Sequence, residues 1–231
     1  MVPAVGGGGC PAGGTPTVPA GHKGPQRNGP FKDAFRNHVV FVYGTGGTRE
    51  ENAWALAKAR YDAERFWYQG NGSIDVVPDT AFVAAPADRD RNVIVYGNAS
   101  TNGAWRLLLR ESPIQVEEGS VRIGGRVLHG GGVGALFLRP RPGSVTASVG
   151  VVGGSGLTGM RLTDTKLYLD AGYPFPDFVV FDFARAERDG EGIVAAGVFG
   201  SGRSLGAGGN AWARGGPSAR GWAAPGWQGR R

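Results

Sequence analysis

The chain has 231 residues, of which 43 are glycine and 15 are proline, and 25 lysines and arginines against 19 acidic residues give it a formal charge of +6. A glycine-rich cation of this kind is typical of nucleic-acid-binding proteins. The excess positive charge, however, belongs to the two ends: residues 1–30 and 200–231 hold seven lysines and arginines and no acidic residue, which leaves the 169 residues between them at −1. We therefore expect a near-neutral folded region and no nucleic-acid partner.

Several classes of protein are excluded by the same composition. No stretch approaches the roughly 18 consecutive apolar residues of a membrane helix, so we expect no membrane span. Cys10 is the only cysteine, which excludes an internal disulfide and a cysteine-based zinc site. The only histidines are His22, His38 and His129, so we expect no metal centre that needs two or three imidazoles. We also predict no cofactor. Residues 1–20 carry no basic and apolar signal segment, so the localisation is left open.

Glycine and proline dominate both ends of the chain, where too little apolar surface is available to offset the entropy of ordering. We predict a disordered segment at 1–29, an α/β domain at 30–199 and a Gly/Arg/Trp-rich tail at 200–231. Arginine and tryptophan alternate in the tail, which would suit stacking on a single-stranded nucleic acid. The alternative, which we favour, is that these residue types share G/C-rich codons and that the tail comes from a shifted reading frame or a misplaced terminus.

The first predicted elements are a strand at 38–43, an apolar run typical of a buried strand, and a long helix after it. Thr48 and Glu51 have the spacing of a capping box at the helix start, and Gly70 is the predicted residue just beyond the helix end. The predicted apolar stripe of this helix consists of Leu56, Ala59, Ala63 and Phe66, with Ala53 and Trp67 beside it.

Strands and short helices alternate along the rest of the domain. We predict strands at 74–77, 92–96, 135–138, 147–152, 178–182 and 193–199, a hairpin at 121–128 and short helices at 103–109 and after 157. This order favours a three-layer, mostly parallel, Rossmann-like sheet with a small β-hairpin insertion. Ligands bind such sheets beyond the carboxyl ends of the strands, which here are the loops at 44–48, 78–80, 97–102 and 153–159.

The first of these loops joins a strand to a helix N-terminus, where free backbone amides can bind an anion. It matches neither phosphate-binding fingerprint, because Arg49 stands where a third glycine is needed and no Gly-Lys-Ser/Thr follows. A structural turn is therefore the favoured interpretation, and anion binding is the alternative. The candidate ligand-binding residues of this loop are Gly44, Thr45, Gly46, Gly47 and Thr48.

The second loop satisfies the dinucleotide pattern G-x-G-x-x-G with Gly154, Gly156 and Gly159, and Asp182 ends a following strand where a ribose-binding acid would lie. Against this interpretation, the helix after Gly159 is short and the pattern arises easily in a glycine-rich chain. Ser155 lies in the same loop, but Leu157 breaks the nucleophile-elbow pattern G-x-S-x-G. No histidine follows Ser155 either, so we assign no catalytic residue.

The core also resembles a known group of proteins. The segments that carry the resemblance are GPFKDAFRNHVVFVYGTGGTREENAWALAKARYDAERFWYQGNGSIDVVPD, NVIVYGNAS, ALFLRPRPG, VGVVGGSGLTGMRL and PDFVVFD. Over residues 29–199 they are similar to the C-terminal region of exported bacterial α/β-hydrolase proteins of the prolyl-oligopeptidase-like and esterase-like kind. The resemblance implies a Rossmann-like accessory domain whose partner is an upstream hydrolase domain of the same parent protein, which holds the catalytic serine. No catalytic residue is carried over to this chain.

Overall fold

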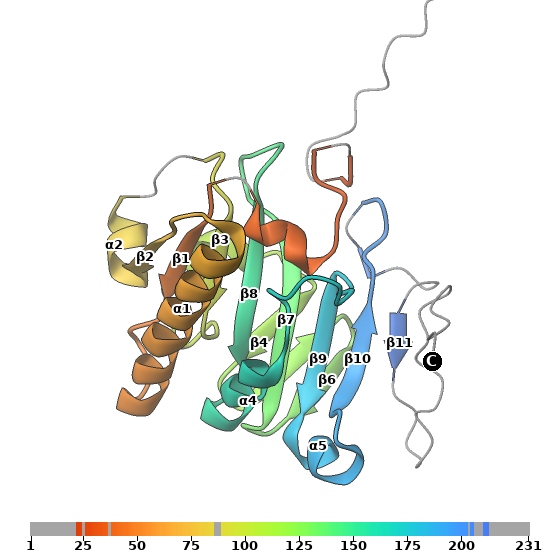
Figure 1. The fold of residues 1–231 in the computed structure, drawn as a ribbon. Coiled ribbons are helices and arrows are strands. Elements are labelled where there is room, and N and C mark those ends of the chain that lie inside the picture. Colours follow the sequence, from red (N-terminus) through yellow and green to blue (C-terminus); the bar gives the residue numbers. More distant parts are fainter. Residues whose placement is uncertain are drawn as a thin grey trace, which may run out of the picture.

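A computed structural model describes residues 22–24, 26–36, 38–85, 89–202, 204–205 and 210–212. An eight-stranded sheet forms the centre of the protein (Figure 1). Its strands are β1 (Val40–Tyr43), β2 (Asp75–Pro78), β3 (Val93–Tyr96), β7 (Val133–Pro140), β8 (Ser148–Gly154), β9 (Phe178–Asp182), β10 (Ile193–Gly197) and β11 (Asn210–Trp212).

The strands lie in the order β11-β10-β9-β7-β8-β3-β1-β2. Parallel pairs join β2, β1, β3 and β8, and antiparallel pairs join β8 to β7 and continue through β9 and β10 to β11. The predicted α/β class is confirmed, and six of the eight strands run in one direction. The sheet is nevertheless mixed, because only residues 141–147 connect β7 to β8. A parallel crossover needs a dozen residues or more, so these two strands pair as a hairpin.

Helices and a second sheet surround the central one. They are η1 (Phe31–Phe35), α1 (Arg49–Gly70), α2 (Asp79–Ala84), α3 (Trp105–Leu109), α4 (Leu157–Leu162), η2 (Thr163–Thr165), α5 (Phe183–Asp189), and the antiparallel strands β4 (Ile114–Glu117), β5 (Ser120–Ile123) and β6 (Arg126–His129). The predicted hairpin is confirmed as β5 and β6, with β4 as a third strand.

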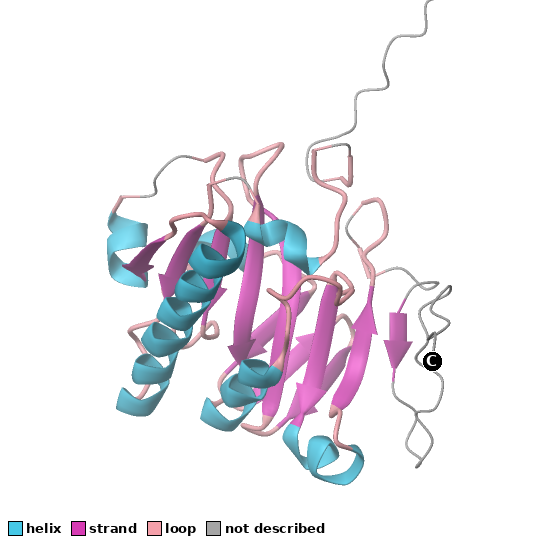
Figure 2. Cartoon of the chain, viewed as in Figure 1, coloured by secondary structure: helices cyan, strands magenta, loops and turns pink. Residues whose placement is uncertain are grey.

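The apolar core lies on both faces of the central sheet. On one face η1, α1 and α4 bury a cluster of aromatic and aliphatic side chains. On the other, α2, α3 and the small sheet bury a second cluster. Figure 2 shows α1 and α4 in front of the central sheet and the small sheet behind it. Among the described residues no helix combines the length and the apolar character of a membrane span.

Helix α1 begins as predicted, because Thr48 and Glu51 form a complete capping box. Its other end differs: Asn71, not Gly70, takes the left-handed conformation, with φ of 50°. The predicted stripe is also rotated, since Leu56, Ala63 and Phe66 are only half-buried. The side chains that α1 buries fully are those of Glu51, Trp54, Ala55, Lys58, Ala59 and Asp62. A prediction based on hydrophobicity alone omits charged residues that are buried as ion pairs, such as Lys58 and Asp62.

Residues next to both predicted domain boundaries contact the domain. Residues 22–24 and 26–29 pack on the domain: Lys23 pairs with Asp177 at 2.6 Å, and the buried Arg27 donates to the carbonyl oxygens of Ser144 (3.0 Å) and Ala147 (2.7 Å). Beyond residue 199, β11 pairs with β10. Specific polar contacts of this kind leave no trace in composition. The rest of the predictions for 1–29 and 200–231 lies outside the described residues.

Thr48→Ala is expected to lower the free energy of unfolding by about 1 kcal/mol, because the amide of Glu51 loses the side-chain acceptor that caps α1. Urea denaturation measures the change. The neighbouring exposed residue provides a control, since Arg49→Ala leaves the capping box intact and should change the stability by less than about 0.5 kcal/mol. Equal effects of the two substitutions would contradict the capping role.

Candidate functional site

The four loops predicted to bind a ligand lie along one edge of the central sheet. Strands β1, β2, β3 and β8 are parallel, so their carboxyl ends meet at this edge. It is the lower edge in Figure 1, where α4 and α5 also lie. Strand β2 lies on one side of β1, and β3, the next strand along the chain, lies on the other side of β1. Open α/β sheets bind ligands at a reversal of strand order of this kind.

The loop at 44–48 uses its own side chains to satisfy its amides. The backbone N–H of Gly47 donates to Asn52 Oδ1 (2.9 Å), and that of Thr48 donates to Glu51 Oε2 (3.0 Å). The carboxylate of Glu51 therefore already occupies the positive end of α1, where an external anion would be stabilised. This arrangement favours the structural-turn interpretation of the loop.

The other candidate residues of this loop contact the loop that follows β3. The amide of Gly46 donates to the carbonyl oxygen of Thr101 at 2.9 Å, and a Cβ on Gly44 would lie 2.5 Å from the same oxygen. Thr45 Oγ1 donates to Asp79 Oδ1 at 2.6 Å. The loops after β1 and β3 are thus packed backbone against backbone, and glycine at position 44 makes this approach sterically feasible.

Sequence reasoning missed three polar residues at this edge. Asn102 Nδ2 donates to the carbonyl oxygens of Val42 and Tyr96, both at 3.0 Å, and so ties the ends of β1 and β3 together. Asn98 Nδ2 donates to the carbonyl oxygen of Gly154 at 2.9 Å, and Asp79 Oδ2 accepts from the amide of the residue after Asn102. Two asparagines in the loop after a buried strand were the available signal, because such residues bond nearby backbone groups.

The glycines of the G-x-G-x-x-G segment allow the chain to pack on itself. A Cβ on Gly159 would lie 2.3 Å from the carbonyl oxygen of Val133, and one on Gly154 would lie 2.4 Å from the carbonyl carbon of Gly159. A Cβ on Gly156 would lie 3.0 Å from the carbonyl oxygen of Gly131. Helix α4 consequently sits directly on β7 and β8. The three glycines therefore serve this packing, and the dinucleotide interpretation of the segment stays a prediction.

Ser155 and Asp182 are also engaged internally. Ser155 is 1% exposed, and its Oγ donates to the carbonyl oxygen of Gly130 (2.6 Å) and accepts from the amide of Val133 (3.2 Å). Asp182 caps α5 by accepting from the amide of Arg185 at 2.9 Å. Both side chains therefore fix the local backbone. The atoms that form these hydrogen bonds are not free to bind a ligand.

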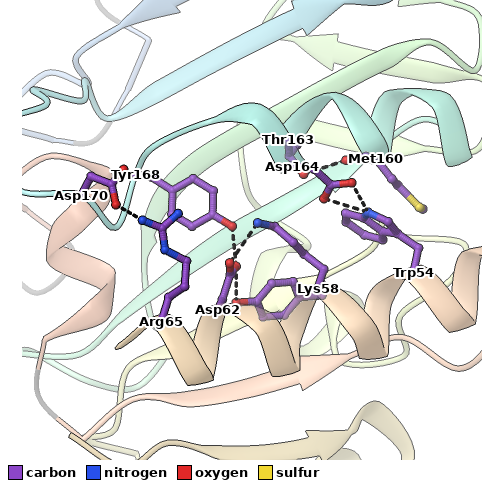
Figure 3. A network of polar contacts seen from close by, with 10 residues as sticks. Trp54, Lys58, Asp62, Arg65, Met160, Thr163, Asp164, Tyr168 and Asp170 are labelled. Carbon is purple, nitrogen blue, oxygen red and sulfur yellow. Dashed lines mark hydrogen bonds and ion pairs between the residues drawn. The ribbon is translucent and has the colours of Figure 1, made fainter. Parts of the chain in front are cut away.

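A buried polar network links α1 to the rest of the fold (Figure 3). Asp62 Oδ1 accepts from Lys58 Nζ at 2.9 Å, while Oδ2 accepts from the hydroxyl of Tyr96 at 3.0 Å and from that of Tyr168. The charged pair is almost completely buried, with 5% of the Lys58 side chain and 1% of the Asp62 side chain exposed. Beside it, the Trp54 indole N–H donates to Asp164 Oδ1 at 3.1 Å.

Burial controls the electrostatics of this network. It raises the pKa of Asp62, against the opposing effects of Lys58 and the two phenol hydroxyls. It also raises the pKa values of Tyr96 and Tyr168 well above 10.0, and the nearby Asp62 carboxylate adds to both shifts. Both tyrosines therefore stay protonated and keep donating to Asp62. Each of these side chains has its hydrogen-bond partner inside the protein. The network therefore suits a structural role, which holds α1 in place, better than proton transfer to a substrate.

Within the part of the chain that the structure describes, no three His, Cys, Asp or Glu side chains come together in a way that could hold a metal ion. Cys10 lies outside the described residues.

Comparison of the sequence with models of known protein families finds no match, and a search of curated proteins finds no significant similarity. The relation to hydrolase proteins that residues 29–199 suggest stays a prediction.

Gly159→Ala is expected to destabilise the protein by about 1–3 kcal/mol or more, because the new methyl group would overlap the backbone of Val133. Chemical denaturation measures the loss. Gly125→Ala is the matched control: a Cβ there has no neighbour within 4 Å, so its effect should stay within about 0.5 kcal/mol. A Gly159→Ala protein as stable as the control would show that α4 does not require this close approach.

The buried tyrosines are expected to make the protein less stable above about pH 10. The pKa values of Tyr96 and Tyr168 are raised in the folded state. As the pH rises, these tyrosines therefore ionise in the unfolded chain before they ionise in the folded protein. The unfolded state then binds fewer protons, and the free energy of unfolding falls by up to about 1.4 kcal/mol per pH unit for each tyrosine.

Urea unfolding over a series of alkaline pH values tests this effect. Tyr168→Phe should reduce the alkaline slope by about one proton. Tyr173→Phe, which removes the hydroxyl of a tyrosine that is 54% exposed, should keep the slope of the unmodified protein. Identical slopes in all three proteins would be evidence against a protonated, buried Tyr168.

Proposed function

We propose that this chain is a non-catalytic α/β accessory domain that works beside a hydrolase domain of the same parent protein. The proposal rests on the resemblance of residues 29–199 to the C-terminal region of exported prolyl-oligopeptidase-like and esterase-like proteins. A fold alone does not define a function, so the support must come from the site. The observation that carries most weight is the burial of Ser155, whose hydroxyl donates to Gly130.

The arrangement around β1 supports a Rossmann-like relation for the domain. Parallel β2, β1 and β3, with α1 crossing between β1 and β2, form the core of such a fold. Its usual ligand crevice is here occupied by the protein's own groups, among them Glu51, Asp79 and Asn102. An edge whose polar groups are hydrogen-bonded within the protein suits a surface that contacts another domain better than it suits an active site.

The carboxyl edge is the proposed contact surface for the hydrolase domain. Its exposed residues come from separate segments: Thr45 and Gly46 from the loop after β1, Thr158 from α4 and Phe183 from α5. The Phe183 side chain is 41% exposed at the start of α5 and supplies an apolar contact. The alternative function, nucleotide binding at the loop 154–159, has less support because α4 packs on that loop.

Hydrolysis assays on the full chain test the non-catalytic role. With aryl esters and prolyl peptides we expect no turnover above buffer, because the described edge offers Ser155 no path to a substrate. Turnover that Ser155→Ala abolishes, while the exposed Ser100→Ala retains it, would overturn the proposal. Circular dichroism of both variants separates lost chemistry from lost folding, since Ser155→Ala leaves the amide of Val133 without its acceptor at a cost of about 1–3 kcal/mol.

A further inference from the structure

The outward side of α1 carries a straight row of exposed residues. The helix lies in front of the central sheet (Figure 2), and its buried side chains, among them Trp54 and Asp62, face the fold. On the opposite side of the helix, exposed residues follow one another at alternating intervals of four and three positions. They are Ala53, Ala57, Arg60, Glu64, Trp67 and Asn71. Alternating intervals of this kind are those of a coiled-coil seam, along which two helices pack.

Large aromatic side chains are exposed near the end of this row. Trp67 and Tyr68 are 55% and 73% exposed, with their ring centres 4.9 Å apart, and Tyr61 is 52% exposed. Tyrosine and tryptophan are enriched at protein interfaces. A large aromatic side chain buries about 150–250 Å² when it is fully covered, so the exposed parts of these three amount to roughly 250–450 Å². They could therefore supply roughly a third to a half of the area that each partner buries in a stable interface, about 800 Å².

Two opposite charges lie in the middle of the row. Arg60 and Glu64 are exposed, and within the part of the chain that the structure describes neither of them forms an ion pair. Their order along the helix is the weaker one for a contact within α1, because a carboxylate four residues before a cation stabilises a helix more than one four residues after it. Both charged groups are thus available to a second molecule.

The row is complementary to itself when two copies of α1 pack antiparallel. A two-fold axis at the level of Asp62 places Arg60 opposite the partner's Glu64, because both positions are two residues from the axis. The same axis places Ala57 opposite the partner's Trp67, so a small side chain leaves room for a large one. A parallel pair would instead set like charges against each other, which is unfavourable.

From this symmetry we propose that the exposed face of α1 binds a second copy of this chain, and that the two copies form an antiparallel dimer. The 22 residues of α1 span about 33 Å, which is long enough for contacts along the whole row. Charged residues at seam positions specify the partner and the register at a cost in affinity. We therefore expect a reversible dimer with a Kd in the micromolar range, about 1–100 μM.

This dimer surface is separate from the carboxyl edge. It lies on the helix side of the sheet, whereas the edge consists of the loops that follow the strands. The dimer therefore does not depend on the accessory role proposed above.

Sedimentation velocity of the full chain over a range of concentrations, up to about 100 μM, tests the dimer. Arg60→Glu and Glu64→Arg each set like charges against each other at the two-fold axis. Each variant alone should weaken self-association about tenfold or more. When the two variants are mixed, opposite charges face each other again at both contacts, so the mixture should associate about as strongly as the unmodified protein. The double variant Arg60→Glu/Glu64→Arg should regain self-association for the same reason.

The matched control is Arg106→Glu, which makes the same change in net charge at an exposed residue of α3, on the other face of the sheet. Its Kd should stay within about twofold of that of the unmodified protein. Thermal unfolding of every variant verifies that the exposed substitutions leave the fold intact. A chain that stays monomeric throughout would overturn the proposal. Self-association that neither charge reversal weakens, or single variants that fail to associate when mixed, would overturn it as well.

Discussion

The carboxylate of Asp62 is the group on which the arrangement of the fold depends most. It is buried between α1 and the central sheet and accepts hydrogen bonds from Lys58 on α1, Tyr96 on β3 and Tyr168 in the segment after η2. Removing a carboxylate and an ammonium group from water costs several kcal/mol for each ion unless all partners are in place. Any rotation of α1 would separate these partners, so the network fixes which face of the helix meets the sheet.

A second constraint is the close approach of backbone at the carboxyl edge. A Cβ on Gly153 would lie 1.9 Å from the carbonyl oxygen of Gly97, and one on Gly159 would lie 2.3 Å from that of Val133 in β7. Glycines that resemble a phosphate-binding loop in the sequence thus let strands, loops and α4 meet without intervening side chains. The same residues that suggest a ligand site in the sequence therefore serve the packing of the fold.

The two edges of the sheet consequently differ in character. At the carboxyl edge, polar side chains such as those of Asn98 and Asn102 donate hydrogen bonds to the protein's own backbone. At the opposite edge, the exposed Arg106 and Arg110 of α3 line a hollow together with the connection between β7 and β8.

Local pattern in the sequence determined the α/β class, most of the strands and the start of α1 at its capping box, because these depend on neighbouring residues. It also placed the candidate loops at the carboxyl ends of the strands. Tertiary structure alone decided the antiparallel half of the sheet, the burial of Lys58 and Asp62, and the internal use of Ser155. The hollow between α3 and the β7–β8 connection belongs to this second group. Each of these features joins groups that are distant in the chain, and the free energy of burying a charge or a polar group is set by such distant partners.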